Sequence, residues 1–340
     1  MRVARLTGIG AIRVFDEPMP HVAAGCSLVR VSTVGLCGSD LHWYVDGGIG
    51  DAKLDHPMVL GHEFSGVIEG GPRGGERVAV DPAIPCEQCE ICREGHRNLC
   101  PDILFAGHGE TDGGLRDFVV WPDRHLVRLP DSISADVGAV LEPLGVAIHA
   151  VDLGHVPLGG TVAVVGCGPI GLLLIQVARA AGAAVVVAVE PLEHRRAAAV
   201  RAGADVVLDA ADDRADLRAA LPRRGADVVF EAAGPAAAVE TAMYAARPGG
   251  RVVLAGIPDD DRTAFSASVA RRKGLTIAVA RRMKEVYPRA IALVQRGLVD
   301  AGSLVTHGYP LDNVEEAFGT AAGRGGLKVV VRPSVAEPLQ

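Results

Sequence analysis

The stretch Thr161-Val-Ala-Val-Val-Gly-Cys-Gly-Pro-Ile-Gly171 decides the fold of the second half of this chain. It reads as a β-branched strand, a glycine-rich turn and the start of an amphipathic helix, residues 170–181, that ends at Gly182. A second β-branched run follows at residues 185–189. Strand, helix and strand form a βαβ unit, which predicts a parallel sheet covered by helices on both faces.

Outward from this unit, the residue pattern of the chain changes. Toward the C-terminus, β-branched runs alternate with Ala-rich segments and predict four more strands, at residues 206–208, 228–230, 252–254 and 275–279. Toward the N-terminus, from Pro130 back, Gly and Pro separate short β-type runs, which is typical of an irregular antiparallel domain or barrel. The chain after Met283 predicts two helices and a last strand, at residues 287–296, 314–322 and 328–331.

This pattern predicts an α/β protein of two domains. A β-rich domain is expected from residues 1–146 and 283–340, and a doubly wound parallel-sheet domain from residues 147–282.

Gly166, Gly168 and Gly171 lie where a dinucleotide-binding loop needs glycine. They allow a tight turn, close approach of the backbone to a pyrophosphate, and close packing of helix on strand, while Pro169 and Ile170 open the helix. The N-terminus of that helix offers amide donors and the positive end of its dipole to the phosphates. The loop therefore predicts a dinucleotide cofactor.

Glu190, at the end of the second strand, indicates which dinucleotide. A carboxylate there can accept hydrogen bonds from the ribose hydroxyls of NAD, and it repels the 2′-phosphate of NADP. Arg195 could lie over the adenine. Alternatively, it belongs to a solvated basic run, His194-Arg-Arg196.

Composition narrows the class of protein. The 340 residues are 49% apolar and 22% charged, as in a soluble globular protein. A net charge of −7 and the lack of a basic tract with interleaved aromatics argue against a nucleic-acid partner. Gln176 and Arg179 interrupt the longest apolar segment, so no membrane partner is expected. Without a recognisable signal peptide, the chain is expected in the reducing cytoplasm.

Cys86, Cys89, Cys92 and Cys100 form the pattern Cys-x-x-Cys-x-x-Cys-x7-Cys. Four thiolates on one loop can close a tetrahedron around a structural zinc ion, with no vacancy for a substrate. Disulfides, unconnected thiols and an iron–sulfur cluster are the alternatives. The short, regular spacing in a cytoplasmic chain favours zinc, whose binding would order a loop that burial cannot order.

Cys37, His62 and Glu63 lie on short polar segments between apolar runs. Cysteine and histidine suit zinc, and a carboxylate can complete or orient the site. Taken alone, Cys37 and His62 are better explained as a packed thiol and a surface histidine. Together with the cysteine cluster and the glycine-rich loop, they predict a second, catalytic zinc site with one open position.

Four segments carry a resemblance to a known family: Leu36-Cys-Gly-Ser-Asp-Leu-His42, His56-Pro-Met-Val-Leu-Gly-His-Glu63, Leu141-Glu-Pro-Leu144 and Leu304-Val-Thr-His-Gly-Tyr-Pro310. The chain resembles the zinc-dependent medium-chain dehydrogenase/reductase family over nearly its whole length, and most closely the sorbitol (polyol) dehydrogenases. The resemblance implies a GroES-like β-rich catalytic domain and a Rossmann domain.

The resemblance also implies roles at the metal site. Cys37 and His62 match the catalytic zinc ligands of the family. Glu63 matches a carboxylate that ligates zinc in some members and stands just off it in others. Glu142 matches a glutamate of the polyol enzymes where alcohol dehydrogenases have cysteine. Which of the two ligates at rest is left open, and exchange between them is plausible.

Further residues match the relay and the substrate contacts of the family. Ser39 and His42 match a relay for the substrate proton, and Asp40 matches an acid that holds the zinc-bound histidine. Arg282 matches an arginine that contacts polyol hydroxyls. Trp43 and Tyr44 are expected in the substrate pocket.

The chain departs from the family pattern at some of these positions. Trp43-Tyr44 reverses the common order of the polyol enzymes, and Met283 stands where they often have tyrosine. The four-cysteine loop is complete here, whereas human-type sorbitol dehydrogenases lack it. The departures at the pocket leave the particular substrate open.

These observations predict an NAD-dependent enzyme with two zinc ions per chain that oxidises a secondary alcohol of a polyol to a ketone. A sibling activity on threonine, butanediol or an aminocyclitol is the alternative, and a non-catalytic protein that binds NAD and zinc is an alternative of another class. The family implies a homodimer or homotetramer, formed through the edge strand expected near residues 275–279.

Overall fold

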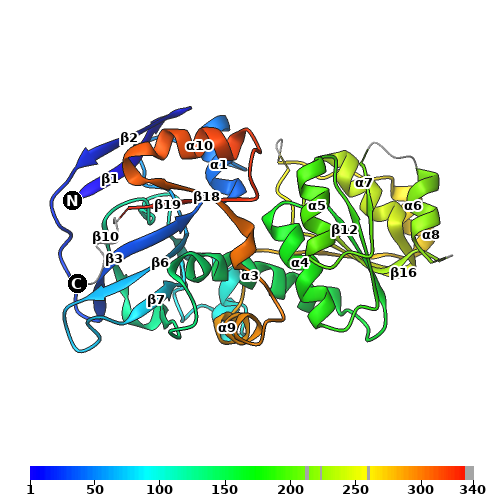
Figure 1. Ribbon diagram of the computed structural model, residues 1–340, viewed down its shortest axis with the longest axis horizontal. Helices are drawn as coiled ribbons and strands as arrows, with labels where there is room; N and C mark the ends of the chain where they lie inside the picture. Colours follow the sequence, from blue (N-terminus) through cyan, green and yellow to red (C-terminus); the bar gives the residue numbers. More distant parts are fainter. Residues whose placement is uncertain (211–213, 223, 259–260, 334–340) are drawn as a thin grey trace. The chain divides into compact units, whose positions relative to one another are not determined.

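The computed structural model describes residues 1–210, 214–222, 224–258 and 261–333. Contacts divide the chain into two compact units. One contains Met1–Glu142 together with Ala301–Gln340, and the other contains Pro143–Asp300. The first and last parts of the chain therefore build one unit, and the middle builds the other (Figure 1).

The first unit is built on a sheet of seven strands. Six of them lie in the order β11-β7-β6-β3-β19-β18, and β10 also pairs with β3. All neighbours are antiparallel except β18 and β19. The bounds are β3 Cys26–Gly35, β6 Glu63–Glu69, β7 Arg77–Val80, β10 Phe118–Pro122, β11 Leu126–Arg128, β18 Val305–Pro310 and β19 Lys328–Arg332. Strand β19, from the end of the chain, lies beside β3 from its beginning (Figure 1).

Smaller elements surround this sheet. They include a hairpin, β1 Arg2–Gly8 with β2 Ala11–Asp16, and the helices α1 Gly38–Asp46, α2 Glu90–Arg93 and α10 Val314–Ala322. Two-residue strands pair as β4 Gly48–Ile49 with β5 Ala52–Lys53, and β8 Ala83–Ile84 with β9 Leu104–Phe105. Short 3₁₀ turns cover Arg97–Leu99, Asp123–His125, Gly302–Leu304 and Leu311–Asn313. Helix α10 packs against β2, β18, β19 and α1 and buries Phe318 in one continuous apolar core.

The second unit is an open parallel sheet of six strands in the order β14-β13-β12-β15-β16-β17. The strands are β12 Thr161–Val165, β13 Val185–Val189, β14 Val206–Leu208, β15 Ala226–Glu231, β16 Ala246–Leu254 and β17 Thr276–Val279. The helices are α4 Pro169–Ala180, α5 Glu193–Arg201, α6 Arg214–Ala220, α7 Ala236–Ala245, α8 Ala267–Lys273 and α9 Tyr287–Gln295. Helix α3, Ala135–Gly154, begins in the first unit and ends in the second.

Alternation along the strands shows that helices cover both faces of this sheet. Ala163 and Val165 share a buried cluster with residues of α6 and α7. The intervening Val164 faces the opposite side, where a Cβ on Gly171 of α4 would lie 3.5 Å from it. Every residue of β12 is buried, as expected of a central parallel strand covered on both faces.

The predicted fold class is confirmed, and so are the predicted strands of the parallel sheet, with small differences at their ends. Strand β16 differs most, because it begins at Ala246, whereas the sequence predicts a strand only from residue 252, and it includes the Pro248-Gly-Gly250 segment. Its register with β15 shifts between Ala226 and Val228, which accommodates the irregular segment.

The structure divides the chain after Glu142 and before Ala301, whereas the sequence predicts divisions after residue 146 and before residue 283. Residues 283–300 pack within the second unit. A Cβ on Gly145 would lie 2.3 Å from Sδ of Met283. Gln176 also exchanges two hydrogen bonds with the backbone of Asp300, at 3.4 and 2.6 Å. Helical periodicity alone does not reveal this tertiary contact.

Helix α3 is long and apolar enough to cross a membrane, with a mean hydropathy of 1.4 in its most apolar window. However, 78% of that window is buried inside the protein, as in a core helix.

Candidate active site

Two strand ends bring the predicted metal ligands together. Gly35, at the end of β3, pairs with Glu63, at the start of β6. Cys37 and His62 lie just beyond these paired ends, with Cys37 in extended conformation as the N-cap of α1. One ligand atom from each of Cys37, His62 and Glu63 lies within 4.8 Å of the others. A thiolate, an imidazole and a carboxylate are a donor set that zinc accepts.

Asp40 holds this arrangement from behind. Its side chain is 1% exposed and accepts hydrogen bonds from the backbone N–H groups of Cys37, at 2.9 Å, and Gly61, at 3.2 Å. Its Oδ1 also lies 3.5 Å from Nδ1 of His62. One carboxylate therefore joins the start of α1 to the segment that leads into His62, and it leaves Nε2 of His62 to bind a ligand or a metal.

The charges of these groups reinforce one another. Burial raises the pKa of Asp40, but the opposing effects of His62 and of the two backbone N–H groups lower it overall. Burial lowers the pKa of His62, but Asp40 and Cys37 outweigh it and hold that pKa well above its ordinary value. In the metal-free chain the imidazole is therefore protonated over a wide pH range, and a metal ion must displace that proton.

Lys328 completes the charge balance, and the sequence analysis missed it. Its ammonium lies 2.8 and 2.7 Å from the two carboxylate oxygens of Glu63 and donates to the carbonyl of Leu36 at 3.0 Å. Both side chains are almost fully buried. Burial lowers the pKa of Lys328, but Glu63 and Cys37 outweigh this and raise it. The only signal in the sequence is a lysine that opens the apolar strand Lys328-Val-Val-Val.

Glycine at position 35 makes room for this ion pair. A Cβ there would lie 2.3 Å from Oε2 of Glu63, so any side chain would collide with the carboxylate. The carboxylate therefore lies over the end of β3.

Glu142, on α3, is 5% exposed and does not join the group of three ligand atoms. Among the residues that the structure describes, none donates a hydrogen bond to its carboxylate. Burial, the largest effect, and the nearby Glu63 raise the pKa of Glu142 to about 7, although His62 and Lys328 oppose them. The structure therefore brings three of the four predicted ligands together and leaves the fourth buried nearby, with no hydrogen-bond donor from the described part of the chain.

The other residues predicted around the metal occupy helix α1. Ser39 and His42 lie three positions apart, on one face of the helix. Nδ1 of His42 lies 2.9 Å from Oδ2 of Asp46, one helical turn further on. Trp43 is 3% exposed and packs edge-on against His108 within the apolar core, while the ring of Tyr44 packs against Phe318.

The four cysteines also come together. One sulfur atom from each of Cys86, Cys89, Cys92 and Cys100 lies within 4.8 Å of the others, and none forms a disulfide. The backbone N–H groups of Cys89 and Cys92 point at the sulfurs of Cys86 and Cys89, both at 3.4 Å. Backbone donors from Gln88 and Cys89 lower the pKa of Cys86 to about 7. This four-cysteine lobe, formed by Cys86, Cys89, Cys92 and Cys100, therefore fits a metal ion that prefers thiolates.

The glycine-rich loop has the predicted form. Gly166 has a φ of 91°, and a Cβ on Gly171 would lie 1.9 Å from its carbonyl oxygen, so helix and strand touch here. Gly168 is the N-cap of α4, and a Cβ on it would meet only a terminal nitrogen of Arg195, at 3.7 Å. Its backbone is therefore open to a ligand such as a pyrophosphate.

Glu190 closes this loop. It is 3% exposed and accepts hydrogen bonds from the backbone N–H groups of Cys167, at 2.7 Å, and Leu192, at 3.0 Å. Arg195 lies beside the loop, whereas the neighbouring Arg196 pairs with Asp209 at 2.8 Å. Arg282, the predicted substrate contact, follows β17 in the second unit with a left-handed φ of 56°.

Family models match both parts of the chain. Residues 23–131 match the alcohol dehydrogenase GroES-like domain, and residues 169–296 match the zinc-binding dehydrogenase model.

Curated relatives match over almost their whole length. The sorbitol dehydrogenase of Bacillus subtilis is 32% identical, and the match covers 98% of each chain. A protein of Neosartorya fischeri described as a probable D-xylulose reductase A is 38% identical over 96% of this chain and 95% of its own.

Solved structures extend the comparison beyond polyol enzymes. An Escherichia coli oxidoreductase of unknown specificity superposes with a TM-score of 0.92 at 31% identity, covering 98% of this chain and 99% of that one. The 2R,3R-butanediol dehydrogenase of Bacillus subtilis gives 0.87 at 30% identity with the same coverage. A zinc-binding dehydrogenase of Sinorhizobium meliloti bound to NADP gives 0.88 at 31% identity, again with the same coverage.

Fold and site therefore define an oxidoreductase with a GroES-like unit and a Rossmann-type unit. The chain belongs to the zinc-dependent medium-chain dehydrogenase/reductase family, close to the polyol dehydrogenases. Members of this family use zinc and a nicotinamide cofactor, and the alternative of a non-catalytic binding protein falls.

The buried Glu142 gives the metal-free protein a specific pH dependence. Its pKa rises from 4.5 to about 7 on folding, so folding favours the protonated form, and the free energy of unfolding falls as pH rises between those values. We expect Glu142→Gln to stabilise the metal-free protein at pH 8, by on the order of 1–3 kcal/mol, and to change little at pH 5. Urea unfolding of chelator-treated protein at both pH values measures this.

Glu110→Gln is the matched control, because Glu110 is an exposed acid of the same unit. An equal effect of Glu142→Gln at pH 5 and pH 8 would show that the carboxylate does not titrate as described.

Proposed function

We propose that this oxidoreductase removes a hydride from a secondary alcohol carbon of a polyol, forms the ketose, and uses NAD as the acceptor. The observation that carries the proposal is the group of Cys37, His62 and Glu63, whose ligand atoms lie within 4.8 Å of one another and of which His62 and Glu63 are buried. The sorbitol dehydrogenase and xylulose reductase relatives support the substrate class.

The two clusters support two zinc ions per chain. Cys37 and His62 would hold one ion, with Glu63 or Glu142 as the carboxylate ligand, and the four cysteines would hold the other. A zinc ion with an open position acts as a Lewis acid on the alcohol oxygen, whereas a four-thiolate site is closed and structural.

Residues of α1 would carry the substrate proton away. Ser39 has a hydroxyl that can accept the alcohol proton and donate its own, and His42 lies one turn further on the same face. Because Asp46 accepts a hydrogen bond from Nδ1 of His42, Nε2 is the nitrogen left free to accept that proton. The nicotinamide cofactor would accept the hydride from the same carbon.

The carboxylates favour a polyol over a simple alcohol. Glu63 and Glu142 provide carboxylates near the metal site, whereas a second thiolate would make the ligand set softer. Oxygen-rich surroundings of this kind suit a substrate that offers two vicinal hydroxyls. Oxidation of butanediol is a sibling function, supported by the likeness to the butanediol dehydrogenase. Threonine and aminocyclitols remain further candidates, and Arg282, Trp43 and Tyr44 are the proposed substrate contacts.

The first experiment tests the reaction and the metal site together. We expect wild-type protein to form NADH with sorbitol or xylitol faster than with 2,3-butanediol or threonine, and to contain two zinc ions per chain. Cys37→Ser should lose turnover and one zinc ion, since a thiolate ligand is removed, while NAD still binds. Absorbance at the NADH band, zinc analysis and a binding titration measure these outcomes.

Cys26→Ser is the control, because Cys26 lies on β3 away from both clusters. Turnover retained in Cys37→Ser would refute the metal site, and faster turnover of butanediol would favour the sibling function.

Glu190 supports NAD over NADP. Its buried carboxylate closes the glycine-rich loop, where the charge would repel a 2′-phosphate. We expect Glu190→Gln, which keeps the shape and one of the two hydrogen-bond acceptors but removes the charge, to raise kcat/KM for NADP relative to NAD at least tenfold, or about 1.4 kcal/mol. Steady-state kinetics with both cofactors measure this ratio.

Glu193→Gln is the matched control, since Glu193 is an exposed acid three residues further along the chain. A wild-type preference for NADP would contradict the assignment of NAD.

A homodimer or homotetramer in the cytoplasm is the proposed state of the protein. Strand β17 ends the parallel sheet, and its Val279 is 71% exposed. An apolar sheet edge of this kind is a surface that another strand can cover. Light scattering should give the mass of a dimer or tetramer, and Val279→Lys should lower it; a monomeric wild type would contradict the proposal.

A further inference from the structure

Residues 59–61, which lead directly into His62, are not part of a strand. Residues 59–61 are held by backbone hydrogen bonds from a second loop: Gly113 to the carbonyl of Val59 at 2.7 Å, Gly114 to Gly61 at 2.7 Å, and Leu115 to Leu60 at 3.1 Å. The two segments touch closely, because a Cβ on Gly113 would lie 2.3 Å from the carbonyl oxygen of Gly61. The placement of His62 therefore depends on the placement of residues 112–115.

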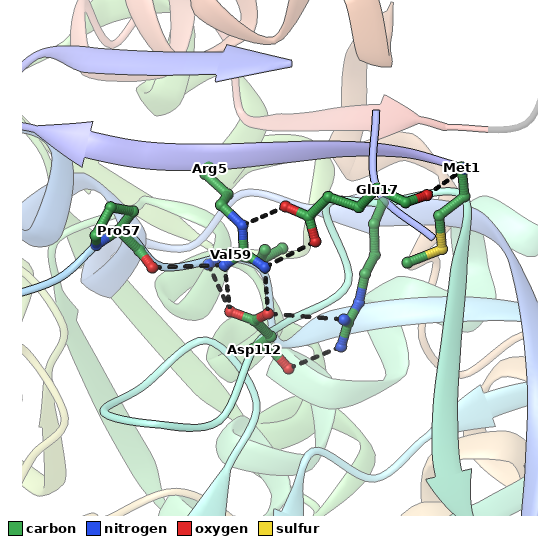
Figure 2. A network of polar contacts seen from close by, with 7 residues as sticks. Met1, Arg5, Glu17, Pro57, Val59 and Asp112 are labelled. Atoms are coloured by element: carbon green, nitrogen blue, oxygen red, sulfur yellow. Dashed lines mark hydrogen bonds and ion pairs between the residues drawn. The ribbon is translucent and has the colours of Figure 1, made fainter. Parts of the chain in front are cut away.

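Asp112 begins the second loop and links it to the N-terminal hairpin. Its Oδ1 accepts a hydrogen bond from the backbone N–H of Val59 at 3.0 Å. Arg5, on β1, donates to both oxygens of Asp112, at 3.1 and 3.0 Å (Figure 2). Arg5 also reaches the carbonyl of Pro57, at 3.4 Å. One guanidinium thus bonds to both of the segments that meet at residues 59–61.

Glu17 anchors the other side of the same guanidinium. Nε and a terminal nitrogen of Arg5 donate to the two oxygens of Glu17, at 2.5 and 3.0 Å (Figure 2). The hydrogen bond from Arg5 lowers the pKa of Glu17. A fork that bonds two carboxylates in one plane is a geometry that arginine provides and lysine does not.

Arg116 cannot replace Arg5 in this role. Its nearest approach to the carboxylate of Asp112 is 3.7 Å, and its Nε is buried without a hydrogen-bond partner in the part of the chain that the structure describes. Without Arg5, Asp112 would be a half-buried carboxylate with one weak cationic neighbour.

We propose that Arg5 is a positioning residue for the metal centre: it holds Asp112, and through Asp112 the backbone of residues 59–61, so that His62 meets Cys37 at the distance that the metal requires. This inference rests on the proposed function, because it concerns the same metal site. Asp40 and Asp112 then hold the two ends of the segment, Asp40 at Gly61 and Asp112 at Val59, and Arg5 holds Asp112.

The four-cysteine lobe makes the test internally controlled. Competition with a chelator should release zinc from wild-type protein in two steps, one for each cluster. We expect Arg5→Met to weaken zinc binding at the Cys37–His62 site by 10–100-fold, as when the support of a metal ligand is lost, and to change the cysteine lobe less than about twofold. Zinc affinity of the Arg5→Lys variant at the Cys37–His62 site should lie between those of wild type and Arg5→Met, because lysine keeps the charge but loses the forked guanidinium.

Arg13→Met is the matched control. Arg13 is the cross-strand partner of Arg5 in the same hairpin, and its side chain is exposed. It removes the same charge from the same hairpin without touching Asp112. The double variant Arg5→Met with Asp112→Asn should bind zinc no more weakly than the weaker of its two single variants, because both act through one link.

The outcomes separate this inference from the proposed function. If Arg5→Met matches Arg13→Met, or weakens both zinc sites equally together with the melting temperature, the positioning role is wrong while the metal site stands. If wild-type protein holds zinc only in the cysteine lobe, the proposed function fails first, and this inference fails with it.

Discussion

A single buried carboxylate, that of Asp40, joins the two chain segments on which the metal centre depends. Strands β3 and β6 are paired, but Cys37 lies after the end of β3 and His62 lies before the start of β6, so their ladder does not position either residue. Asp40 supplies what the ladder lacks, because it accepts hydrogen bonds from the backbones of both segments and lies beside the imidazole as well. The backbone N–H donors of Cys37 and Gly61 offset the free-energy cost of burying its charge, and they do so only when the two segments come together.

Charge balance explains the rest of the centre. Glu63 and Lys328 form a buried pair that is neutral as a unit, and the glycine at position 35 gives it space. Glu142 is buried nearby and has no such partner among the described residues, so the fold alone does not stabilise its ionised form. A divalent ion bound by Cys37 and His62 would displace the proton of His62 and place positive charge beside Glu142, which a structural ion-pair cluster of these residues would not do.

The features that the sequence predicts correctly are those encoded by residues close together in the chain. The parallel strands, the loop at Gly166 and the four cysteines are all encoded within short windows, by periodicity, by glycines that need room and by ligand spacing. Arg5 and Lys328 act on residues far away in the chain, and no window contains both partners.

The two candidate metal clusters differ in whether they would leave a coordination position of the metal free. The four cysteines come from one short loop, their sulfurs face one another, and a tetrahedral ion there has no ligand left to exchange. Cys37, His62 and Glu63 come from two segments, and each is held by a different part of the fold: the start of α1, the Asp40 contact and the Lys328 pair. If these three groups hold a tetrahedral zinc ion, as proposed, one position of that ion is left to a group outside the three. Under the proposed function a substrate oxygen would take that position, whereas the four cysteines would leave none.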